Sequence, residues 1–286
     1  MAQPVGRDPS VDWLDGPVWT PDTTVTWNLE LRADELVATP RPGQPVFPGH
    51  LELRYLEELE IIVLSEDEVR LTVSAETVHS RSVLSLDDAA RLLGREPPGM
   101  PSETGLVVHA SGCPLCDRDL VGRRGADGWR VTLLDEERPT ESEQTVLDRL
   151  ALVLGPDGYP EQPLAEGANG VLGAEAFERW FGHLLGDLEA SGSWQVRGVE
   201  HRDAGRGAVV DLQALAAGTW VAPILPPFEV ELLLNGQTFR PLDHRLDAEL
   251  TLHGLMVIVP EPGSPDNVVA SDSRGEVTIT LRTEVR

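Results

Sequence analysis

The chain has 286 residues, enough for one large domain or for two to three ordinary ones. It carries 48 acidic and 23 basic side chains, and the resulting formal net charge of −25 disfavours binding to nucleic acid or to anionic lipid. The sequence contains no lysine, which excludes Schiff-base chemistry and a lysine general base.

The sequence predicts a soluble cytoplasmic protein. No apolar run reaches the roughly 18 residues that a membrane helix needs. The first ten residues lack the basic flank and apolar core of a signal peptide. Two cysteines in the whole chain are typical of a reducing compartment.

Residues 1–84 are predicted to form a β-rich module with an extended lead-in. Apolar residues alternate along 25–31 and again along 68–78, the pattern of strands with one buried face. A Pro-rich segment at 40–49 indicates a loop between them. Trp13 and Trp19 in the lead-in are expected to pack on this module, with docking on a partner as the alternative.

Residues 85–190 are predicted to form a central α/β module. Helical spacing favours helices over 85–94, 140–155 and 174–190, and residues 104–110 are typical of a short strand. Thr140 or Ser142 would cap the start of the second helix, and Gly155 would end it.

Residues 191–286 are predicted to form a second β-rich module. The segments 193–203 and 207–215 would pair as a hairpin, and Asn235-Gly236 is expected to form a turn.

The two β regions resemble each other in sequence. "LELRYLEELEIIV" is similar to "AELTLHGLMVIV", and "EVRLTVSAETV" is similar to "EVTITLRTEV", with a third similar pair upstream. Either a duplicated module or the shared alternation of strands explains this. Duplication predicts equivalent inward-facing pairs: Val69 with Val277, Leu71 with Ile279, and Val73 with Leu281.

Both cysteines lie in "HASGCPLCDRDL", residues 109–120. A Cys-x-x-Cys pair at a helix start favours redox chemistry, because helix amides stabilise the thiolate. The segments "GLVVHASGCPLCDRDL", "WRVTLLDEERP", "TVLDRLALVLG", "GYPEQPL" and "GVLGAEAFERW" follow in an order that resembles the glutaredoxin branch of the thioredoxin-like fold. The resemblance covers about 103–188. It implies that Cys113 is the nucleophile, Cys116 the resolving cysteine and Pro160 the cis-proline.

The resemblance has departures. The family has a basic residue just before its cysteines, where this chain has Ala110, Ser111 and Gly112. Pro163 interrupts the apolar strand expected after Pro160, because proline cannot donate to a strand ladder.

Two other interpretations of the cysteines stay open. His109, Cys113 and Cys116 resemble half of a zinc site, but a structural zinc needs four ligands and the chain has no second Cys-x-x-Cys. The cysteines are alternatively small half-buried residues without chemistry.

The sequence therefore predicts an α+β multi-domain fold, with two β-rich, sandwich-like modules flanking a central thioredoxin-like module. The predicted function is that of an acidic interaction or assembly protein with a protein partner and no cofactor. The alternative is a thiol–disulfide oxidoreductase or redox sensor that uses Cys113 and Cys116, and zinc is a weaker alternative ligand.

Overall fold

The computed structural model describes residues 19–38, 50–85, 103–110, 113–116, 118–135, 138–155, 166–172, 174–181, 185–220, 228–243, 246–260 and 272–286. Trp13, Pro160 and the helix predicted over 85–94 beyond Ser85 lie outside these residues. No helix in the described part of the chain is long and apolar enough to cross a membrane.

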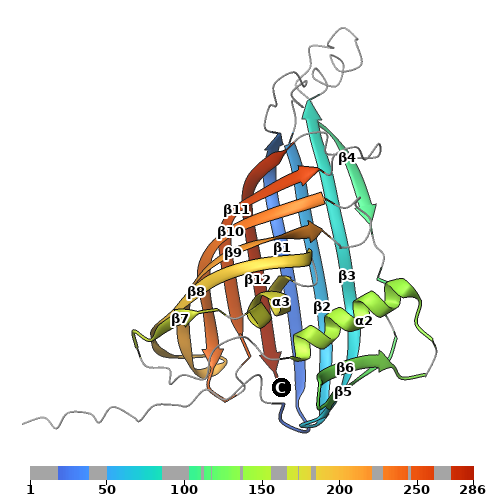
Figure 1. Cartoon of the computed structure of the whole chain (residues 1–286), viewed down its shortest axis with the longest axis vertical. Coiled ribbons are helices and arrows are strands. Elements are labelled where there is room, and N and C mark those ends of the chain that lie inside the picture. Colours follow the sequence, from blue (N-terminus) through green and yellow to red (C-terminus); the bar gives the residue numbers. More distant parts are fainter. Residues whose placement is uncertain are drawn as a thin grey trace, which may run out of the picture.

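Twelve strands and two helices make up the described fold (Figure 1). The strands are β1 (Thr24–Ala38), β2 (His50–Ser65), β3 (Glu68–Ser85), β4 (Glu103–Ala110), β5 (Leu120–Gly125), β6 (Gly128–Leu133), β7 (Asn169–Val171), β8 (Leu185–Arg202), β9 (Gly205–Trp220), β10 (Phe228–Pro241), β11 (Glu249–Pro260) and β12 (Ser273–Val285). The helices are α2 (Glu141–Leu154) and α3 (Ala174–Phe181).

All twelve strands belong to one sheet, in the order β6-β5-β3-β2-β1-β12-β11-β10-β9-β8-β7, with β4 paired to β3 beside this path. The named strands pair in antiparallel fashion throughout. The predicted α+β fold with two separate sandwich-like modules is therefore wrong. The two β regions join edge to edge through β1 and β12, which pair along twelve positions from Val25↔Val285 to Ala38↔Ser273.

The predicted thioredoxin-like module is also wrong. That fold needs parallel strands joined by crossover helices, whereas β4 and β5 both pair antiparallel with β3 of the first β region. The order strand, Cys-x-x-Cys, strand, helix is present in the chain, but β4 pairs antiparallel with β3, and β5 pairs antiparallel with β3 and β6.

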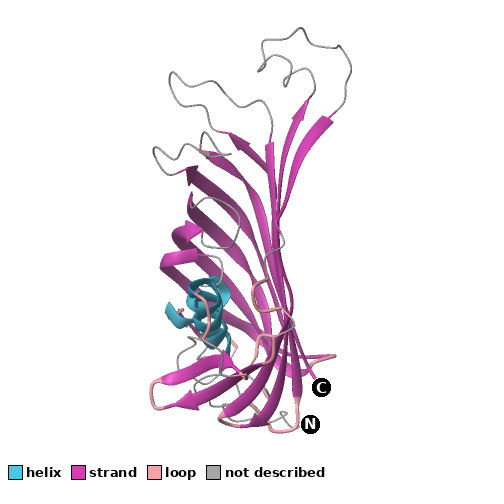
Figure 2. Cartoon of the chain, turned by 90° about the vertical axis from the view of Figure 1, so that its right-hand side faces the viewer, coloured by secondary structure: helices cyan, strands magenta, loops and turns pink. Residues whose placement is uncertain are grey.

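The sheet curves around the two helices, as the side view shows (Figure 2). Alternate residues face inward and form a large apolar core, and in β1 these include Trp27, Leu29 and Leu31 at 0–1% exposure. All six inward positions predicted from the sequence similarity are buried, from Val69 and Val277 to Val73 and Leu281. The meanders β1–β2–β3 and β10–β11–β12 also share the same strand order.

The helix predicted over 140–155 is confirmed, as is its cap. The Thr140 hydroxyl accepts a hydrogen bond from the Glu143 N–H, and the Thr140 N–H donates to the Glu143 carboxylate at 2.7 Å. This capping box satisfies two of the free amides at the helix start.

The helix predicted over 174–190 is too long. α3 ends at Phe181, and β8 has begun by Leu185, which pairs with Trp220 of β9. Strand pairing in the large sheet overrides the local helical pattern here.

Asn235-Gly236 forms no turn and lies inside β10, opposite His253 and Leu252 of β11. A Cβ atom at Gly236 would overlap the carbonyl oxygen of Thr251. Glycine at this position therefore permits a close approach of two strands rather than a reversal of the chain.

Candidate functional site

The two cysteines form a disulfide in the turn between β4 and β5, with 5.3 Å between their Cα atoms. Both side chains are half-buried against the core, and Cys116 forms an isolated bridge to Val73 of β3. No helix follows the motif among the described residues, because β5 begins at Leu120. The helix amides that would activate Cys113 as a nucleophile are therefore missing from this part of the structure.

The predicted zinc ligands are only partly described. His109 lies in β4, with its backbone opposite His79 of β3. The disulfide occupies both sulfur atoms, so neither cysteine is a thiolate ligand in this state. The described residues contain no group of three His, Cys, Asp or Glu side chains that could hold a metal ion. Zinc binding stays a prediction.

Three leucines form an exposed row on the outer face of the sheet. Leu233 of β10 lies directly opposite Leu215 of β9 on one side and Leu255 of β11 on the other. Their exposures are 54% for Leu215, 53% for Leu233 and 40% for Leu255. Side chains directly opposite each other on paired strands are in contact range, so the leucine row is one continuous apolar strip.

The leucine row contrasts with the outer face of β1. The outward positions of β1 between Thr26 and Arg32 are Thr, Asn, Glu and Arg, as expected for the solvated side of an antiparallel sheet. On β9–β11 the next row adds half-buried Ala217 and Val257 beside the leucines. Clustered exposed apolar side chains of this kind mark interaction sites more often than single ones do.

Carboxylates lie along one side and at one end of the leucine row, whereas the row on its other side contains Gln213, Asn235 and His253. Glu276 of β12 continues the row beyond Leu255, and the neighbouring row contains exposed Glu189 and Glu231. Arg274 is the basic residue in that neighbouring row. The rim is therefore predominantly acidic, in keeping with the net charge of the chain.

A second feature lies on the inner face, where four buried side chains form what we call the carboxylate cluster: Tyr55, Glu57, Glu76 and Arg149. The Tyr55 hydroxyl lies 3.2 Å from a Glu57 oxygen and 3.4 Å from a Glu76 oxygen. Arg149 of α2 donates to the same Glu76 oxygen at 3.1 Å. The cluster thereby fastens α2 to β2 and β3.

Burial controls the protonation of the carboxylate cluster. It raises the pKa of Glu57 to about 7, against the opposing effects of the Arg149 charge and the Tyr55 hydrogen bond. Burial also raises the pKa of Glu76 and of Tyr55. Glu57 and Glu76 lie directly opposite each other on β2 and β3, and the Arg149 charge acts on both, so the cluster is neutral overall when the two carboxyl groups hold one proton between them.

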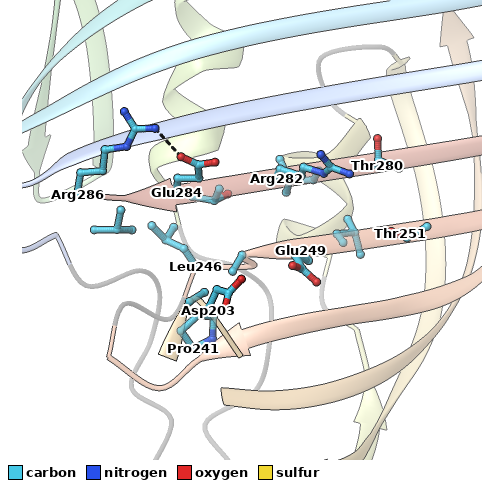
Figure 3. A pocket seen from close by; sticks show the side chains of 15 residues that line it. Asp203, Pro241, Leu246, Glu249, Thr251, Thr280, Arg282, Glu284 and Arg286 are labelled. Atoms are coloured by element: carbon cyan, nitrogen blue, oxygen red, sulfur yellow. Dashed lines mark hydrogen bonds and ion pairs between the residues drawn. The ribbon is translucent and has the colours of Figure 1, made fainter. Parts of the chain in front are cut away.

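A groove of about 570 Å³ lies at the lower end of β11 and β12 (Figure 3). Its lining mixes Asp203, Glu249 and Glu284 with Arg282 and Arg286. Glu284 pairs with Arg286 at 2.7 Å, and Glu249 pairs with a neighbouring arginine, Arg202, at 3.0 Å. Because these charges balance one another, the groove has no charge preference that would select a class of ligand.

Sequence reasoning missed both the leucine row and the carboxylate cluster. Each had a local signal. Leu232, Leu233 and Leu234 are consecutive in an alternating strand, so one of them must face outward, and Glu57 occupies an inward position between Tyr55 and Leu59.

The sequence matches no protein-family model and no curated protein. Among solved structures, it is similar to a chain of lipovitellin from a study of lipid–protein interactions, with 10% sequence identity and a TM-score of 0.43. The match covers 94% of this chain and 26% of the lipovitellin chain. Likeness at this level establishes no family for the protein.

Proposed function

We propose that the protein is an interaction or assembly protein that binds a partner protein through the leucine row. The observation that carries the proposal is the register of β9, β10 and β11, which places three half-exposed leucines directly opposite one another. Burying such a strip against a partner is favourable, at roughly 25 cal/mol per Å² of apolar surface.

The proposal includes the two related β regions as the scaffold of the binding surface. The shared meander order supports a duplicated module, whereas the register differs between the two regions, because Val69 lies opposite Val63 and Val277 lies opposite Gly254. β10–β11–β12 carries most of the leucine row. The net charge of −25 supports a protein partner over nucleic acid or anionic membrane.

A thiol–disulfide function is the second candidate, supported by the Cys113–Cys116 disulfide. It ranks below the first because no helix follows the motif in the described part of the chain. The cytoplasmic location predicted from the sequence stays a prediction, and the disulfide weighs against it because disulfides persist mainly in oxidising compartments.

The test compares partner capture by the wild-type protein with that by Leu233→Thr. Threonine keeps strand propensity while it removes most of the apolar surface. Val199→Thr is the matched control, because Val199 is also exposed, at 43%, but lies on β8 away from the row. Captured proteins from the producing cell are then purified and their affinities measured individually.

We expect at least one purified partner to bind Leu233→Thr about tenfold more weakly than wild type, the effect of losing about 1.4 kcal/mol at an interface centre. Val199→Thr should bind that partner within twofold of wild type. Equal binding of every partner to Leu233→Thr and wild type would remove the leucine row as the binding surface.

A further inference from the structure

We propose that the partner element is a basic amphipathic helix that lies across the strands along the leucine row. This inference rests on the function proposed above and specifies the chemistry of the partner.

Spacing favours a helix. Neighbouring strands lie about 4.8 Å apart, so the three leucines span about 10 Å at the level of the backbone. The outer face is the convex side of the curved sheet, so side chains diverge from one another as they leave it (Figure 2). Helix residues one turn apart rise by about 5.4 Å, so a stripe at i, i+3 or i+4, and i+7 spans about 11 Å. The two periodicities therefore match across three contacts.

An extended partner laid along the same row fits poorly. Side chains on one face of a strand recur every 6.8 Å or so, and three of them span about 14 Å. The repeat of such a segment is therefore longer than the backbone spacing of the strands that carry Leu215, Leu233 and Leu255, and a helix matches that spacing more closely.

The charges beside the leucine row indicate which residues should flank the apolar stripe of the partner helix. Glu189, Glu231 and Glu276 border the leucine row, against Arg274 as the nearby basic residue. Lysine or arginine on the side of the apolar stripe that faces Glu189 and Glu231, and at the end that faces Glu276, would complement these carboxylates. A second copy of this chain would instead bring the same carboxylates together, and an anionic bilayer would meet the same repulsion.

The small, convex contact area limits the expected affinity for a helical peptide. Three leucines and their half-buried neighbours, Ala217 and Val257, form a contact well below a standard protein interface, so binding to an isolated helix should be weak and should depend on salt.

The experiment uses the full chain and three labelled 18-residue peptides. The first has leucines at helical spacing and lysines elsewhere. The second peptide has the same composition, but its leucines stand at every second position in one block, which is the pattern of an extended strand. The third is the first with glutamate for lysine. Fluorescence anisotropy measures binding to wild type, Leu233→Thr and Val199→Thr at low and high salt.

We expect the helical basic peptide to bind wild type at least tenfold more tightly than either of the other peptides. The affinity should fall about tenfold in Leu233→Thr, stay within twofold in Val199→Thr and weaken with salt. Leu233→Thr and Val199→Thr both leave the net charge of the protein unchanged. A difference in affinity between these two variants therefore does not come from general attraction between a cationic peptide and an acidic protein.

Three results would overturn the proposal. Equal or tighter binding of the alternating peptide would indicate an extended partner. Binding of the helical peptide that is unchanged in Leu233→Thr would place it elsewhere. Leu233-dependent binding of wild type to phosphatidylserine vesicles would indicate a membrane. If partner capture still depends on Leu233 after such a result, only the proposal of a helical partner is rejected and the leucine row remains the proposed binding surface. If capture does not depend on Leu233, both proposals are rejected.

Discussion

Replacing Glu57 by glutamine should stabilise the protein at high pH. The carboxyl group is buried, and burial raises its pKa from the usual 4.5 to about 7. Glutamine is neutral at every pH, and its side-chain oxygen can still accept the hydrogen bond from Tyr55.

The sign follows from proton binding in the two states. Between pH 4.5 and pH 7 the folded state holds a proton on Glu57 that the unfolded state has lost, so raising the pH through this window destabilises the fold. A pKa displacement of this size corresponds to about 3 kcal/mol at pH 8, and to less than about 1 kcal/mol at pH 5. Glu57→Gln should therefore exceed wild type in free energy of unfolding by about 3 kcal/mol at pH 8, with the gain disappearing as the pH falls.

Urea denaturation followed by tryptophan fluorescence at pH 5, 6, 7 and 8 measures this difference. Glu60→Gln is the matched control, because it removes one negative charge from an exposed position of the same strand. Its effect should stay within about 0.5 kcal/mol at every pH. The reasoning fails if Glu57→Gln is less stable than wild type at pH 8, or if its gain does not depend on pH.

The remaining predictions concern the inner face and the disulfide. Leu71→Asp should destabilise the fold by several kcal/mol in urea denaturation, because it buries an unpaired charge. Arg70→Asp on the outer face should cost about 1 kcal/mol at most. Similar losses of stability in the two variants would contradict the assigned faces. Reduced Cys113 should alkylate with the pH dependence of an ordinary thiol, near pKa 8.5, because no described helix follows Cys116 to stabilise a thiolate; rapid alkylation at pH 6 would favour the redox function.

Alternation along the strands was enough to predict the inward faces. Val69, Leu71 and Val73 are buried as expected, because period-two patterning in an antiparallel sheet depends only on neighbouring residues. The cap of α2 was predictable for the same reason, since Thr140 and Glu143 are three residues apart.

The hairpin predicted over 193–203 and 207–215 is confirmed as the pairing of β8 with β9, but strand partners far apart in the sequence could not be predicted from local patterns. Leu120 begins a strand that pairs with Leu71, 49 residues earlier in the sequence, and nothing in either segment specifies the other. The central segment therefore resembled a thioredoxin-like order of elements while its strands extended a different sheet. The helix predicted to continue over residues 185–190 was wrong for a similar reason. Helical spacing depends only on nearby residues, whereas β8 forms by pairing with β9.

The leucine row and the carboxylate cluster are two of the places where the sheet departs from inward apolar and outward polar residues. Glu57 places a charge inward, and Arg149 of α2 lies near enough to lower its pKa against the effect of burial. Leu233 places an apolar side chain outward, where it remains 53% exposed. An exposed leucine contributes little to the fold, and two more directly opposite it on neighbouring strands increase the risk of aggregation. Departures from local rules are expected at functional sites, and Glu57 has a structural explanation within the described fold. The row containing Leu233 has no such structural explanation, which is why we propose the binding function for the outer face and not for the buried cluster.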